Sequence, residues 1–100
     1  MKIGLLLFGS ESVTASPPPP PGAPQEVICF TYSGTKKGLE WTDAPGDEDA
    51  SHDVSVDSGA SVLGTRPPGS TTWASGGTTC LGLAVRHNRS GNVSAWVGFL

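Results

Sequence analysis

The sequence predicts an all-β protein, a sandwich of about seven antiparallel strands preceded by an extended N-terminal arm. Fourteen glycines and nine prolines separate short apolar runs, a composition typical of all-β sandwiches. No stretch repeats apolar residues at a helical period, so no helix is expected. One hundred residues form one domain, with room for a core but not for a core and a deep active site.

A β-hairpin near the C-terminus is the clearest predicted element. Leu81, Leu83 and Val85 alternate with small residues, as in a strand with one buried face. A polar turn is expected over residues 86–92, and a second apolar strand over residues 93–99.

Five further strands are expected upstream of the hairpin. Leu39 and Trp41 alternate and therefore share one face, and Trp73 is expected to point inward. The five strands are expected at residues 26–32, 38–42, 52–56, 61–65 and 70–74.

Three features then indicate a family. The hairpin ends on a Gly-Asn-Val-Ser-x-Trp pattern at residues 91–96, Trp41 precedes a loop rich in proline and acidic residues, and residues 52–56 read His-Asp-Val-Ser-Val. Together they resemble the bacterial type of fibronectin type III domain, an immunoglobulin-like sandwich, over about residues 23–97. The family usually has tyrosine where His52 and Thr79 stand. The resemblance implies a non-enzymatic module that acts as a spacer, adhesion unit or binding platform.

The N-terminal fifteen residues form an apolar segment with two open interpretations. The apolar run is too short for a membrane span, which needs about 20 residues. It is a marginal signal peptide with a cleavage site at residues 13–15, or a retained arm that adds as a strand to another protein. The partner-binding side chains of such an arm are Ile3, Leu5, Leu6, Leu7 and Phe8.

Residues 16–24 form a proline-rich linker between this segment and a sandwich at residues 25–100. Pro17 to Pro21 favour polyproline II at ~3.1 Å per residue, and therefore a semi-rigid spacer.

Charge and side-chain chemistry predict neither nucleic-acid binding nor catalysis. The formal net charge is −3, which gives no basic footprint for nucleic acid. His52 and His87 are expected at the surface or rim, toward different ends of the sandwich, so they do not form an active site with a serine nucleophile. No catalytic or cofactor-binding residues are predicted.

An acidic stretch is the one candidate for a metal. A calcium ion needs several carboxylates, but the order of residues is not that of a dedicated loop, and a solvated loop is the favoured interpretation. No His/Cys grouping has zinc spacing, so no metal site is expected. The acidic residues are Asp43, Asp47, Glu48, Asp49 and Asp53.

The two cysteines permit one disulfide. Strand parity directs Cys80 away from the core, so a bridge needs Cys29 on the same outer surface. Two free thiols are favoured, and the cellular compartment stays open.

The expected final turn offers a weak contact surface. Arg86, His87 and Arg89 give it a positive tip, and loop tips are where sandwich domains often bind. Asn88 and Asn92 begin formal N-glycosylation triplets.

These features favour a structural or decoration protein on a bacteriophage surface, attached to capsid or tail subunits through its arm. The alternative is a secreted bacterial accessory or adhesion module that binds carbohydrate or cell-surface material. Host-surface glycans are a second expected class of partner. Stacking on sugar rings needs exposed aromatics in a line, whereas Trp41, Trp73 and Trp96 are expected mostly in the core.

Overall fold

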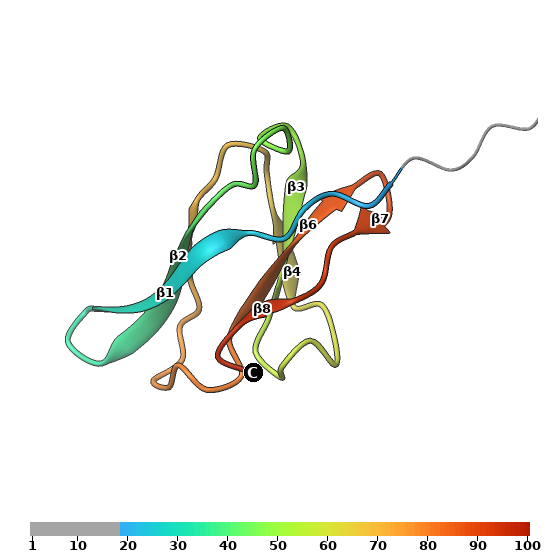
Figure 1. The fold of residues 1–100 in the computed structure, drawn as a ribbon. Coiled ribbons are helices and arrows are strands. Elements are labelled where there is room, and N and C mark those ends of the chain that lie inside the picture. The colour runs from blue at the N-terminus through green and yellow to red at the C-terminus, as the bar shows by residue number, and fades with distance from the viewer. Residues whose placement is uncertain (1–18) are drawn as a thin grey trace, which may run out of the picture.

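The computed structural model describes residues 19–100 as two antiparallel β-sheets (Figure 1). The first sheet has the order β1-β2-β5, and in the second β4-β3-β6 continues to β7 and β8, which pair with the two ends of β6. The strands are β1 Gln25–Tyr32, β2 Lys36–Thr42, β3 Ser51–Ser55, β4 Gly64–Arg66, β5 Thr72–Ala74, β6 Ala84–Arg89, β7 Asn92–Val93 and β8 Val97–Gly98. The described residues include no helix, so the all-β prediction is confirmed.

The hydrophobic core lies between the two sheets. Leu39 and Trp41 of β2 and Trp73 of β5 are buried, as their alternation predicts. From the second sheet Val54 of β3 and Val85 of β6 pack against them. Each such side chain contributes about 1.5–3 kcal/mol on burial, so these contacts hold the two sheets together.

The strand β6 lies further along the chain than predicted. It begins at Ala84, and residues 75–83 are a loop in which Leu81 is 71% exposed. The strand continues through residues 86–89, which were expected to turn, and the reversal occurs at Ser90 and Gly91. The polar side chains of residues 86–89 bond to residues elsewhere in the domain, as described below. The polarity of this stretch therefore did not indicate a loop.

Glycine makes the loop before β6 possible. Gly82 has a φ of +90°, a conformation that other residues rarely adopt. A Cβ atom there would lie 2.5 Å from the carbonyl oxygen of Val56. The loop therefore packs against the backbone that follows β3.

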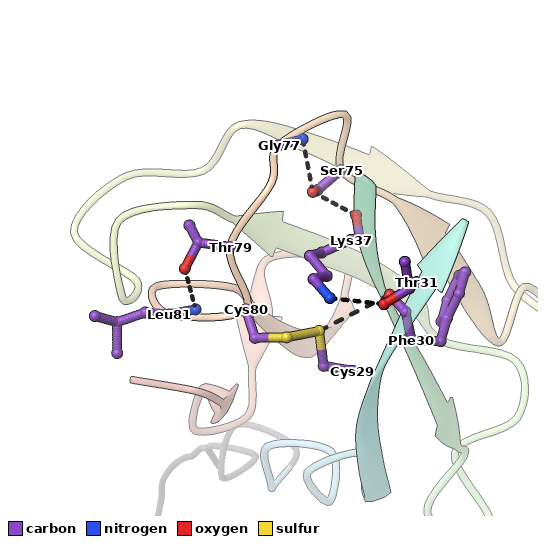
Figure 2. The surroundings of a disulfide bond; sticks show 9 residues. All are labelled: Cys29, Phe30, Thr31, Lys37, Ser75, Gly77, Thr79, Cys80 and Leu81. Atoms are coloured by element: carbon purple, nitrogen blue, oxygen red, sulfur yellow. Dashed lines mark hydrogen bonds between the residues drawn. A yellow bond between two sulfur atoms is a disulfide. The ribbon is translucent and has the colours of Figure 1, made fainter. Parts of the chain in front are cut away.

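The expectation of two free thiols is wrong, because Cys29 and Cys80 form a disulfide with their Cα atoms 6.0 Å apart (Figure 2). The parity argument failed because Cys80 lies in the loop and not in a strand, so alternation with Leu83 says nothing about its direction. Cys29 packs against the core from β1. The same loop is held by Ser75, whose Oγ donates to the carbonyl oxygen of Lys37 at 2.7 Å.

Replacing both Cys29 and Cys80 by serine is expected to lower the free energy of unfolding by about 4 kcal/mol. The bridge joins residues 51 positions apart, and opening a loop of that length restores chain entropy to the unfolded state. Urea unfolding followed by tryptophan fluorescence measures the loss. The reduced wild type serves as the control and should unfold at the same urea concentration as the double variant; a wild-type midpoint unmoved by reductant would contradict the bridge.

Candidate functional site

Two histidines predicted to lie apart are neighbours. His52 of β3 and His87 of β6 face each other directly in the strand register, and their ring centroids are 4.7 Å apart. Neither is exposed to solvent, so the expectation of surface or rim positions is wrong. His52 precedes Val54 by two residues and His87 follows Val85 by two, so both rings lie on the core face of the sheet.

Asp43 connects the two rings. It follows β2, and its Oδ1 lies 2.8 Å from His52 Nε2 and 3.0 Å from His87 Nε2. Burial by itself would raise the pKa of Asp43, but the hydrogen bonds with His87 and His52 outweigh it and hold that pKa below its usual 3.8. The carboxyl is therefore a carboxylate at neutral pH.

The end of the proline-rich linker covers this cluster. The carbonyl oxygen of Gly22 lies 2.6 Å from His87 Nδ1, and the Gly22 N–H donates to Asp47 Oδ2 at 2.8 Å. Pro21 and Pro24 on either side are buried, and the chain runs beside β6 and β7 before it enters β1 (Figure 1). Residues 21–24 are thus packed onto the sandwich, and we call them the linker strap.

Only glycine fits at the centre of the linker strap. A Cβ atom on Gly22 would lie 2.9 Å from the Cβ of Ala44, closer than side-chain carbons approach one another. The hydrogen bond from Gly22 N–H, assisted by Arg89, also holds the pKa of Asp47 below its usual 3.8. Both the absence of a side chain and the N–H of Gly22 are therefore used in the contacts of the linker strap.

The tautomer of His87 follows from these contacts. A carbonyl oxygen can only accept a hydrogen bond, so His87 Nδ1 carries a proton and donates it to Gly22. The Asp43 carboxylate also can only accept, so it places the proton of His52 on Nε2, and His52 Nδ1 has no hydrogen-bond partner among the described residues. The ring of Trp41 packs against His52 with centroids 5.2 Å apart.

The cluster has the composition of a metal site that the sequence spacing did not predict. Asp43, His52 and His87 each offer one ligand atom, and these atoms lie within 4.8 Å of one another. The signal available in the sequence was strand parity, since both histidines share the face of neighbouring core valines. Strand pairing and the return of the loop after β2 then bring the three together.

The three residues of the expected positive tip lie in β6. Arg86 Nε donates to Asp53 Oδ2 at 2.9 Å within the sheet, and its guanidinium lies 4.5 Å from the ring centre of Trp96. Arg89 binds both Asp47 and Asp49. All three predicted contact residues, Arg86, His87 and Arg89, therefore have acidic partners within the domain.

These pairings also change two other expectations. Trp96 is half-buried and stacks with Arg86, whereas it was expected in the core. Four carboxylates of the acidic stretch, on Asp43, Asp47, Asp49 and Asp53, face histidine or arginine, so they do not gather around one point as calcium requires.

The predicted arm residues Ile3, Leu5, Leu6, Leu7 and Phe8 lie outside the described residues. Across residues 19–100, no helix is long and apolar enough to cross a membrane.

Comparison of the chain with protein-family models, curated proteins and solved structures found no match.

Replacing Asp43 by asparagine is expected to lower the free energy of unfolding by about 2 kcal/mol, the usual contribution of hydrogen bonds to a charged group. It should also speed hydrogen exchange at the Gly22 amide, because the linker strap is held through His87. Urea unfolding and exchange measured by NMR report the two effects.

Asp49→Asn is the matched control. It makes the same chemical change on a carboxylate that is 79% exposed, where an ion pair contributes little. Equal destabilisation by the two variants would show that the buried cluster has no special role in stability.

Proposed function

We propose that this chain is a non-enzymatic display module, in which a fibronectin type III-like sandwich is held on the surface of a bacteriophage particle. Residues 1–15 attach it to capsid or tail subunits, and the proline-rich linker holds the sandwich away from them. The observation that carries the proposal is the linker strap, whose Gly22 bonds to His87 and Asp47.

A linker that merely tethered the domain would need no contacts with it. Here residues 21–24 are packed against the sandwich and hydrogen bonded at both polar groups of Gly22. The chain therefore leaves the domain in one direction, and the prolines that precede it favour a stiff continuation. A stiff connection at one end is what a displayed domain requires.

The sheet order supports the family part of the proposal. If β7 and β8 are taken as one interrupted strand, β1-β2-β5 corresponds to strands A, B and E of a fibronectin type III domain. The second sheet, β4-β3-β6 with β7 and β8, corresponds to C′, C, F and G. Trp41 occupies the core position on the second strand that the resemblance implies.

The position of the histidines supports a non-enzymatic role. Both rings are fully buried beneath the linker strap, where a substrate has no direct approach. The ring nitrogen of His87 that faces the linker is occupied by a backbone carbonyl. The cluster therefore has a structural role, which is to hold the linker strap on the sandwich.

The proposed arm binds strongly only where sites are repeated. Burying three or four of its five large side chains yields roughly 5–10 kcal/mol, and association costs 4 kcal/mol or more. Strand pairing with the partner and many copies on a symmetric lattice supply the additional binding free energy that stable attachment needs. A virus particle provides both conditions.

Deleting residues 1–15 is expected to abolish co-sedimentation with the particles made by the producing cells, while the sandwich stays folded. Sedimentation of the full chain and of the truncated chain measures attachment, and circular dichroism checks the fold. A truncated chain that still sediments with the particles places attachment on the sandwich, against this proposal.

The disulfide favours a second candidate, a secreted module that binds carbohydrate or cell-surface material. Disulfides persist mainly outside the reducing cytosol, and the Cys29–Cys80 bridge forms within this domain. In the bacteriophage proposal the bridge forms after the particle leaves the cell.

Mass spectrometry of the native N-terminus separates the two candidates. The display proposal expects a chain that begins at residue 1 or 2, since the arm is retained. A chain that begins at Ser16 has lost the segment as a signal peptide, which would favour the secreted module. Recombinant protein made without a secretion route is the mass reference.

A further inference from the structure

We propose that Asp43, His52 and His87 bind one zinc ion at the end of the sandwich that the linker strap covers. This inference goes beyond the display function and does not depend on it. It starts from the ligand atoms themselves, which are two imidazole nitrogens and one carboxylate oxygen within 4.8 Å of one another.

The separations suit an ion of this size. Ligand atoms around a tetrahedral zinc ion, bound at about 2.0–2.1 Å, lie about 3.3 Å from one another. Asp43 Oδ1 is 2.8 Å from His52 Nε2 and 3.0 Å from His87 Nε2. The bound state thus requires the carboxylate oxygen to move slightly away from the two nitrogens, which lie within 4.8 Å of each other.

The hydrogen bonding of His87 is the strongest argument for a cation. Its Nδ1 donates to the carbonyl oxygen of Gly22, the arrangement that fixes most metal-binding histidines with the other nitrogen free to ligate. In the neutral ring this directs the lone pair of Nε2 at a carboxylate oxygen 3.0 Å away. Two electron-rich atoms at that distance repel unless a positive charge lies between them, and zinc or a second proton supplies it.

His52 is free to act as the second nitrogen ligand. Its Nδ1 has no hydrogen-bond partner among residues 19–100, so the proton that Nε2 shares with Asp43 can move to Nδ1 when an ion takes its place. With the proton on Nδ1, Nε2 directs a lone pair to the same point as Nε2 of His87. One ion then satisfies both nitrogens and the carboxylate together.

The surroundings fix the three protein ligands and leave one coordination position for water. The two rings are fully buried and fixed opposite each other by the β3–β6 register. The Asp43 side chain is 11% exposed, so the cluster is not completely closed to water. Three protein ligands and a water molecule complete a tetrahedral shell.

The test uses the untagged full chain with its disulfide intact, freed of metal by dialysis against a chelator. Titration with Zn²⁺ in a calorimeter is expected to give about one ion per chain. Titration with Co²⁺ is expected to give the intense visible absorption of a tetrahedral site with nitrogen and oxygen ligands. In NMR spectra, the ring protons of His52 and His87 are expected to shift on zinc addition.

Asp43→Asn and His87→Gln are expected to weaken zinc binding by at least about tenfold. Asp49→Asn, which alters an exposed carboxylate at the same end, is expected to leave binding unchanged. Circular dichroism establishes that each variant is folded, and the wild-type NMR shifts identify the ligands even if a variant fails to fold.

Two results would overturn the proposal. If the wild type binds no zinc with the ion in large excess, a second proton on His87 supplies the positive charge and the cluster is a hydrogen-bonded network. If zinc binds but leaves the ring protons of both histidines unshifted, the ion lies elsewhere on the chain.

Discussion

The structure at one end of the sandwich depends on a single carboxylate oxygen shared by two buried imidazole rings. Polar groups in a protein interior are costly unless they are paired, and here Asp43 Oδ1 lies within hydrogen-bond distance of both His52 and His87. Removing any one of them leaves the others buried with an incomplete set of partners. The cluster therefore joins the loop after β2, the strand pair β3–β6 and, through Gly22, the incoming chain.

A second constraint acts on a different part of the domain. The disulfide ties the loop of residues 75–83 to β1, and it supplements a core that is small because the chain is short. Between these two cross-links lie the contacts of Leu39, Trp41 and Trp73 with the facing sheet. A small sandwich is thus stabilised by its core and by specific bonds at two places where the chain is irregular.

The parts of the fold that the sequence predicted are those governed by local alternation. Leu39, Trp41 and Trp73 face the core because they alternate along their strands with polar or small neighbours. The same rule failed at β6, where the charged and polar residues 86–89 remain in the strand because partners such as Asp53 and Asp47 accept their hydrogen bonds. Local pattern carries no information about such partners, which come from distant parts of the chain.

The candidate site was missed for a related reason. His52 and His87 are 35 positions apart, and their meeting depends on the β3–β6 register and not on spacing. Cys80 was misjudged because a loop was taken for a strand, which gave its side chain a direction that it does not have. Parity relative to Val54 and Val85 would have placed both histidines inward, but Asp43 and Gly22 enter only through the folded arrangement.

The linker strap shows why a buried polar cluster is useful in a module of this kind. An apolar contact between linker and sandwich would resist separation but permit sliding, because hydrophobic attraction has little directional preference. Hydrogen bonds at both the N–H and the carbonyl of Gly22 fix position and direction together. The buried prolines Pro21 and Pro24 pack against the sandwich. Their φ angles are restricted by the ring, so the backbone on either side of Gly22 has little conformational freedom. The polar cluster thus fixes the position and direction of the linker strap on the sandwich, and it requires that two polar histidine rings be buried in the core.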